Sequence, residues 1–502
     1  MTHAVEITTA QDGTEPATDR ARWIALVVLC VGMLMIVLDA TVVNVALPSI
    51  QKDLGFSQST LAWVMNAYLI AFGGLLLLAG RFGDLLGRKS IFMAGLTVFT
   101  LASLACGAAQ SQEMLVAARF VQGVGGAMTS AVILGMIVTM FPEPREQAKA
   151  IGVYGFVASA GGSIGLLVGG VLTQAVNWHW IFFVNIPIGI ATGLVAVRLL
   201  ERERGIGFGG GADVPGAVLI TSSLMLGVYT IVKPAAEYGW GAGRTLGLAA
   251  ASLALLVAFV VREARAANPL IPLGIFRSRN VSGANVIQAL LVAGMFGTFF
   301  LGSLYLQRVR HYDALEIGLA FLPATIVMGI LSLRYSDRLI NRFGARRTLI
   351  PGVVLVAAGL ALFTRAPVHG SYAVDVLPVM ILIGFGVGTA FPALMTLAMS
   401  GATQEDAGLA SGLVNTTMQV GGALGLAVLA TLSATHTRDI AHGGRQTAAA
   451  LTSGYHLAFV IGAALAVAAI AVAVRVLRAD DVPAAAEHGA APAAEPAYCE
   501  AA

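Results

Sequence analysis

The sequence has little charge, and this shortage excludes a soluble globular protein. Only 11% of its 502 residues are Asp, Glu, Lys or Arg, whereas about a quarter are charged in a typical soluble domain. Hydrophobic residues make up 57%, and the mean hydropathy is +0.82. The sequence therefore predicts an all-α membrane protein with many spans embedded in the lipid bilayer.

Cysteine and histidine are also sparse, which argues against a disulfide framework or a metal centre. Cys30 and Cys106 lie in apolar spans and Cys499 near the end of the chain, so no pairing pattern is present. The eight histidines lack the paired spacing of metal ligands. The first 20 residues contain four acids and no basic stretch before an apolar core, so we expect no signal peptide. We expect no metal and no cofactor.

A nucleotide-driven machine is also disfavoured. The segment from Gly83 to Ser90 has glycines followed by Lys89, but its spacing differs from that of a phosphate-binding loop and no strand precedes it. The net charge of +3 gives no sign of a nucleic-acid partner. An ATP-driven pump or a membrane enzyme is therefore the weaker interpretation.

Long apolar runs are what the sequence does contain. About 20 apolar residues span a bilayer, and fourteen segments fit this template. They lie near residues 23–46, 61–79, 90–109, 114–139, 150–172, 180–198, 214–232, 245–261, 282–306, 316–333, 348–364, 376–399, 408–432 and 455–474.

The distribution of basic residues predicts the orientation. With fourteen spans both termini lie on one side, and that side holds 21 of the 30 lysines and arginines; eight lie opposite, and Arg119 lies within a span. The positive-inside rule therefore places both termini in the cytoplasm. Only four of the basic residues are Lys and alanine is abundant, which is typical of a GC-rich bacterial genome. We expect the plasma membrane of a bacterium.

A ten-residue turn occurs twice, at Gly80–Lys89 and at residues 337–346, with an offset of 257 residues. The copies share an Arg, a Gly and a final basic residue. The second copy has Asn341 in place of Asp84 and Asp337 in place of Gly80. The repeat predicts two six-helix halves and five segments: a cytoplasmic N-terminal segment (1–22), the N-terminal half (23–200), an inserted two-helix segment (201–280), the C-terminal half (281–477) and a disordered tail (478–502).

Asp39 is the one acid well inside an apolar span, in the stretch Leu38–Pro48. A carboxylate in hydrocarbon is costly and requires a partner, and Arg119 is the candidate. At ~1.5 Å per residue both lie roughly 10 Å below the outer surface. Arg119 opens a run with Gln122, Gly123 and Gly126 on one helix face. The alternative is that Arg119 extends to the outer interface and that Asp39 has a structural role.

Two further stretches are informative. Gly161, Gly165 and Gly169, with Gly170 beside them, form a groove for close packing of another helix. Trp178–Pro187 follows it. In the repeated turn, Gly80 and Gly87 permit a tight bend, while Asp84, Arg88 and Lys89 supply charges that could pair across the two halves. An ordinary positively charged cytoplasmic loop is the alternative for this turn.

Taken together, these motifs resemble the major facilitator superfamily, and the fourteen spans resemble its EmrB/QacA-type branch of drug:proton antiporters, from about Trp23 to Leu477. The resemblance implies a major facilitator fold and export of small hydrophobic or cationic drugs in exchange for protons. It implies that Asp39 and Arg119 couple proton movement to transport, that the first repeated turn is a gate, and that the glycine groove is the antiporter motif. Leu166 stands where that motif has Pro, which leaves a proton-coupled importer or an uncoupled facilitator open.

The substrate path is expected between the two halves. Its candidates are polar residues on interior helix faces: Asn44, Asn66, Gln122, Asn285, Gln288, Asn415 and Gln419. For each of them a hydrogen bond between helices is the alternative. Few fixed charges lie among them, which favours a hydrophobic or cationic organic substrate. Besides substrate, protons and lipid we expect no partner, and a monomer.

Overall fold

The computed structural model describes residues 19–200, 205, 207, 212–266, 268–399, 407–442 and 447–477, and every regular element within them is a helix. Most of the predicted N-terminal segment (1–22) and the whole predicted tail (478–502) lie outside the described residues, as does most of the stretch 201–211 that opens the insert.

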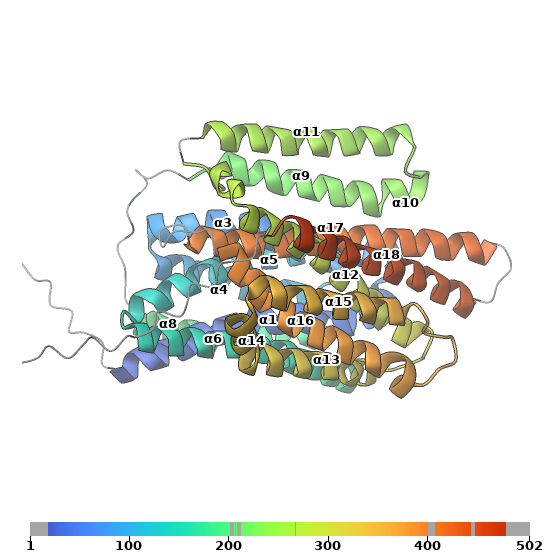
Figure 1. Ribbon diagram of the computed structural model, residues 1–502, viewed down its shortest axis with the longest axis horizontal. Coiled ribbons are helices and arrows are strands. Elements are labelled where there is room, and N and C mark those ends of the chain that lie inside the picture. Colours follow the sequence, from blue (N-terminus) through green and yellow to red (C-terminus); the bar gives the residue numbers. More distant parts are fainter. Residues whose placement is uncertain are drawn as a thin grey trace, which may run out of the picture.

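The helices fall into three groups along the chain (Figure 1). The N-terminal half contains α1 (Asp19–Leu54), α2 (Gln58–Leu61), α3 (Trp63–Leu86), α4 (Arg88–Gly107), α5 (Gln112–Met140), α6 (Pro144–Ala175), α7 (Trp180–Phe183) and α8 (Asn185–Leu199). The insert contains α9 (Val214–Val232), α10 (Pro234–Tyr238) and α11 (Gly243–Arg265). The 3₁₀ helix η2 (Leu273–Arg277) leads to the C-terminal half: α12 (Arg279–Arg308), α13 (Ala314–Arg334), α14 (Ser336–Phe343), α15 (Ala345–Phe363), the π-helix η3 (Tyr372–Val376), α16 (Leu377–Met399), α17 (Ala407–His442) and α18 (Thr447–Arg475).

The predicted spans correspond to these helices. Thirteen helices among the described residues are long and apolar enough to cross a membrane, and the remaining predicted span, near 150–172, lies in the 32-residue helix α6. Two helices, α1 and α17, are 36 residues each and extend well beyond the predicted spans. Their polar ends continue as helix outside the apolar window, because hydropathy marks only the part that lies in hydrocarbon.

The two halves repeat the same packing. In the N-terminal half α4 packs on α5, α3 on α5 and α1 on α6; the equivalent helices of the C-terminal half, α15 with α16, α13 with α16 and α12 with α17, pack in the same way. Between the halves α6 packs on α13 and, equivalently, α3 packs on α17. The internal repeat is therefore present in the helix packing as well as in the sequence.

The repeated turn has the same backbone conformation in both copies. Gly87 separates α3 from α4 with φ 93°, and Gly344 separates α14 from α15 with φ 85°. Only glycine adopts this conformation readily. The shared glycine is thus explained by a backbone requirement that both halves have.

The inserted helices lie along one side of the bundle (Figure 1). Helix α9 packs on α3 and on α17, so it touches both halves, whereas α11 packs mainly on α9. Large apolar side chains of α11 point away from the protein, and Leu253 is 61% exposed. This face is suited to lipid.

The halves are joined at the ends that the predicted orientation places outside the cell. Three described hydrogen bonds connect side chains of the two halves: Arg308 to Gln51, Gln58 to Ser433 at 3.2 Å and Gln174 to Asp313 at 2.8 Å. Asp313 also caps α13 by accepting from the backbone N–H of Glu316 at 2.8 Å. Polar contacts therefore hold the halves together at this end. One of them uses Asp313, the residue that caps the start of α13.

Candidate functional site

Asp39 is fully buried in α1 and accepts three hydrogen bonds from two neighbouring helices. Its Oδ2 lies 2.5 Å from Nη1 of Arg119 on α5. Its Oδ1 accepts from Nε2 of Gln122 at 2.7 Å and from Nδ2 of Asn185 on α8 at 3.1 Å. These hydrogen bonds, one of them from a guanidinium, fix the Asp39 carboxyl group to α5 and α8.

Arg119 is also fully buried, so it does not extend to the outer interface. Besides Asp39, it donates from Nε to the backbone oxygen of Val64 at 3.0 Å and from Nη1 to Oε1 of Gln122 at 2.7 Å. Its guanidinium carbon lies 4.4 Å from the ring centroid of Tyr68 and 5.7 Å from that of Phe182. Aromatic faces of this kind stabilise a cation away from water.

Gln122 links this pair to α4. Its Nε2 donates to Ser103 Oγ at 2.9 Å, and its Oε1 accepts from Cys106 Sγ at 3.5 Å. The sequence predicted Gln122 as a cavity residue, but the structure places it fully buried inside the Asp39 network. Ser103 and Asn185 were missed, although Asn185 lies in the stretch Trp178–Pro187; isolated short polar residues in apolar runs give little signal.

The network leaves several buried polar atoms unsatisfied. No hydrogen-bond partner among the described residues is found for Arg119 Nη2, Asn185 Oδ1 or Tyr68 Oη. Nearby in the sequence, Asn66 has no partner for either its Oδ1 or its Nδ2. Unpaired buried polar atoms are costly, and functional sites are one place where they occur.

The charged residues of the first repeated turn contact the N-terminal half. Asp84 pairs with Arg88 at 3.5 Å, and Arg88 donates to the backbone oxygen of Gly135 at 3.2 Å. Lys89 donates to the backbone oxygens of Val197, at 2.8 Å, and Leu200. These described contacts fix α5 and the end of α8 to the turn. We expected the charges of the turn to pair with the C-terminal half instead. A Cβ on Gly80 would stand 3.9 Å from the Cβ of Ala131 on α5, an ordinary van der Waals contact.

The glycine groove of α6 faces two helices. A Cβ on Gly165 would stand 1.9 Å from Thr41 Oγ1 of α1, and one on Gly169 would stand 3.0 Å from the Cα of Val42. Gly161 faces α1 in the same way, whereas Gly170 faces the backbone of Ala314 in α13. The groove therefore brings α6 to backbone distance of α1 and, at the end that the predicted orientation places outside the cell, of the C-terminal half.

Leu166 lies at this junction between the halves. A Cβ on Gly318 of α13 would stand 2.6 Å from the backbone oxygen of Leu166, and the Leu166 side chain is buried. Helix α6 continues without interruption from Pro144 to Ala175. The residue in the proline position thus belongs to a close helix contact.

Comparison with known proteins identifies the family. The family model described as Major Facilitator Superfamily matches residues 29–426. The chain belongs to the Major Facilitator Superfamily. Puromycin resistance protein pur8 of Streptomyces alboniger is 40% identical over 461 residues, 90% of this chain and 91% of that protein. Cephamycin export protein CmcT of Amycolatopsis lactamdurans is 39% identical over 457 residues, 91% and 92% of the two chains.

Solved structures agree on the superfamily fold. A bacterial homologue of the human lysosomal transporter Spinster, in an inward-facing and unoccupied conformation, superposes with a TM-score of 0.65 at 16% identity, covering 92% of this chain and 97% of that one. A mutant of the nucleoside transporter NupG gives a TM-score of 0.64 at 12% identity, with 91% and 100% coverage. The predicted fold is confirmed, and the chain is a multi-pass membrane transporter of this superfamily.

The predicted cavity residues lie on several helices of both halves. In the C-terminal half, Asn285 of α12 donates to its own helix at Val281 and accepts from Thr417 of α17 at 2.8 Å. One turn later Gln288 is buried, and its Oε1 has no partner among the described residues. Gln419 of α17 is nearly buried and packs against Gly73 of α3. These three side chains therefore lie along the helices that meet where the halves join.

The remaining two candidates differ in their surroundings. Asn44 of α1 is partly buried and donates to the backbone oxygen of Ala40 at 3.0 Å. Asn415 of α17 is also partly buried.

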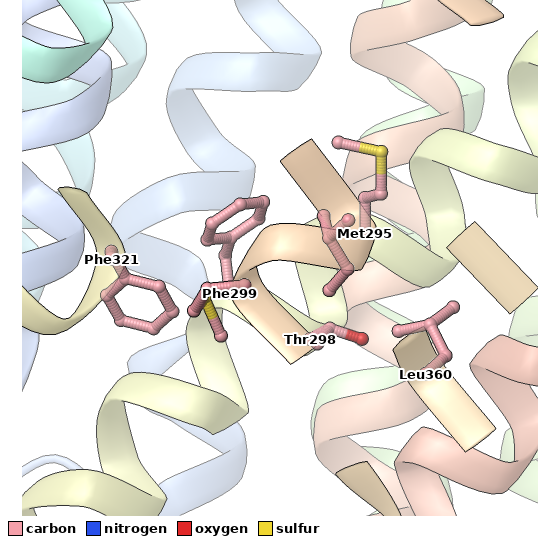
Figure 2. Close-up of a pocket in the computed structure, with 7 residues that line it drawn as sticks. Met295, Thr298, Phe299, Phe321 and Leu360 are labelled. Atoms are coloured by element: carbon pink, nitrogen blue, oxygen red, sulfur yellow. The ribbon is translucent and has the colours of Figure 1, made fainter. Parts of the chain in front are cut away.

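An apolar pocket lies inside the C-terminal half, and none of the predicted cavity residues lines it. Figure 2 shows Phe299 and Phe321 on one side and Thr298 and Leu360 on the other. Its side chains leave no room even for a water molecule, whereas sites for drug-sized ligands measure about 300–1,000 Å³. We do not assign substrate binding to this pocket.

Proposed function

We propose that this transporter exports small hydrophobic or cationic compounds, antibiotics among them, from the cell in exchange for protons. The observation that carries the proposal is the buried pair of Asp39 and Arg119 in a network of five polar side chains. Two relatives that align with about nine tenths of the chain, at 40% and 39% identity, are named as resistance and export proteins. Their names support transport out of the cell.

Proton coupling is proposed to act through Asp39. A proton on the carboxylate removes its charge, and the attraction that holds Nη1 of Arg119 at 2.5 Å weakens. Arg119 retains its contacts with Tyr68 and with the backbone of Val64. A neutral Asp39 therefore changes the packing of α1 against α5 while Arg119 remains positively charged.

Substrate is proposed to bind between the halves, near Gln288, Asn415 and Gln419, with Asn285 on α12 and Asn66 on α3 as further polar candidates. Burial of Gln288 and Gln419 gives a polar but uncharged lining. Such a lining suits amphipathic organic molecules, because a phosphate or a carboxylate would require fixed positive charges.

We propose that the first repeated turn acts as the inner gate.

We further propose that the transporter works as a monomer in the plasma membrane of a bacterium, with both termini in the cytoplasm. The closed outer end then corresponds to a state that opens toward the cytoplasm. Rocking of the halves would break the outer polar contacts and expose the cavity to the outside.

The experiment that tests the proposal is efflux of cationic and neutral dyes and antibiotics from cells that produce the protein or Asp39→Asn. Asn keeps an oxygen that accepts from Arg119 but cannot exchange a proton. Asp53→Asn is the matched control, because Asp53 lies on the same helix with a side chain that is 57% exposed. We expect the intact protein and the control to lower accumulation only while a proton gradient is present, and Asp39→Asn to lose this gradient-driven efflux.

The importer or facilitator remains the second candidate, because Leu166 replaces the proline of the antiporter motif. Accumulation that increases with expression, or efflux by Asp39→Asn at the unmodified rate and gradient dependence, would contradict coupled export through Asp39. Proton uptake on adding substrate to vesicles separates an antiporter from a facilitator, since a facilitator moves no protons.

A further inference from the structure

Two buried carboxyl groups lie on the inserted helices, far along the chain from Asp39. Asp213 stands at the start of α9 and is 4% exposed, and Glu263 lies in the last turn of α11 and is 3% exposed. In the predicted orientation both lie at the cytoplasmic ends of their helices. The proposed transport mechanism uses neither residue.

One oxygen of each carboxyl group is well satisfied. Asp213 Oδ1 accepts from the backbone N–H of Gly216 at 3.0 Å and from Nε of Arg262 at 2.8 Å. Glu263 Oε2 accepts from the backbone N–H of Ile271 at 2.9 Å. The pair therefore ties the start of α9, the end of α11 and the connection that leads to α12.

The other oxygen of each carboxyl group has no donor among the described residues. Asp213 Oδ2 and Glu263 Oε1 have no hydrogen-bond partner among the described residues. They lie 2.6 and 2.8 Å from the point where a Cβ on Gly216 would stand, so both oxygens border the same small volume. Leaving two buried acceptors without a donor is costly. One donor placed between them could serve both oxygens.

Among the described residues, one ion pair involves the two carboxyl groups, between Arg262 and Asp213. Arg262 is the cation in contact, and its side chain is 44% exposed, so solvent screens its charge. The neighbouring part of α3 supplies Leu78 and Phe82 to an apolar cluster with Phe259 and Leu270. The charged residues of the same part of α3 are Arg81 and Asp84, and Asp84 pairs with Arg88.

We propose that Asp213 and Glu263 form a second proton-binding site, which holds one proton between Asp213 Oδ2 and Glu263 Oε1. This proton supplies the donor that both oxygens lack and removes one of two like charges in a buried place. It fastens the connection at Leu270 and Ile271 to the insert. When the proton leaves as the pH rises, the two carboxylates repel and this attachment loosens.

The first test is thermal unfolding of the full-length protein in detergent between about pH 6 and about pH 9, for the intact protein and for Glu263→Gln. Gln supplies an N–H donor at the same place at every pH. The folded state of the intact protein holds a proton that the unfolded state releases at neutral pH, so its Tm should fall by a few degrees as the pH rises, beyond any general trend. Glu263→Gln should lose this additional fall.

One control variant and one second test variant complete this experiment. Glu237→Gln removes an exposed carboxylate from the same insert and should keep the pH slope of the intact protein. Asp213→Asn, which also supplies a donor and remains a good N-cap, should flatten the slope as Glu263→Gln does; it replaces that variant if Glu263→Gln does not fold. Hydrogen exchange in residues 268–278 should be slower in the amide variant than in the intact protein at about pH 9 and equal at about pH 6.

Parallel pH slopes in the intact protein and both amide variants would overturn the proposal. A Tm that rises with the sodium or magnesium concentration at fixed pH would also overturn it, because the two carboxyl groups would then bind a metal cation and not a proton. An amide variant that is less stable at every pH with an unchanged slope would show a hydrogen-bonded contact without a proton site.

Discussion

Replacing Asp39 by Ala should destabilise the protein strongly, because it leaves Arg119 charged, fully buried and without a counter-ion. Breaking a buried ion pair by removing one partner costs about 3–5 kcal/mol. The amides of Gln122 and Asn185 also lose the acceptor that they contact at 2.7 and 3.1 Å. Asp39→Asn, which keeps an acceptor oxygen, should cost clearly less.

The double variant Asp39→Ala with Arg119→Leu identifies the cause. With both charges removed no unpaired charge remains, so the loss should be smaller than the sum of the two single losses. Asp84→Ala is the control: its pair with Arg88 is 3.5 Å long, with the carboxylate 43% exposed, and such pairs contribute at most about 1 kcal/mol.

The assay is thermal unfolding of the purified variants in one detergent at neutral pH. We expect the lowest Tm for Asp39→Ala, an intermediate Tm for Asp39→Asn and partial recovery in the double variant. If Asp39→Ala were no less stable than Asp84→Ala, or if the two single losses simply added, the buried pair would not have the energetic role assigned to it.

Three further predictions concern other parts of the molecule. Gly87→Ala should lower stability by about 1–2 kcal/mol, because φ is 93° there; an unchanged Tm would contradict the turn geometry. Asn185→Ala should weaken gradient-driven efflux and shift its pH profile, whereas loss of protein yield with an unchanged profile would indicate a folding role only. Cysteines at Gln174 and Asp313, joined by a short bis-maleimide in a cysteine-free background, should stop transport; full transport by the cross-linked protein would show that the outer end need not open.

Hydropathy and repeat spacing were sufficient to predict the fold, because spans and turns are local properties of the sequence. Depth along a helix also brought Asp39 and Arg119 into the same layer before any contact was known. The contribution of Asn185 was not predictable, since its partners lie on helices distant in sequence and a single amide in an apolar run has no periodic signature. The pairing of Glu263 with Asp213 was not predictable either, because a charged residue at the end of a membrane span is usual on the cytoplasmic side.

The described partners of the Asp39 side chain all come from the N-terminal half, on α5 and α8. If the halves rock as units, this network travels with one of them, and no bond of Asp39 to the other half has to break during the cycle. Energy coupling and substrate choice would then be separable parts of the molecule. Exchanging α12–α18 for those of a relative with another substrate should alter which compounds leave the cell while the dependence on the proton gradient is inherited unchanged.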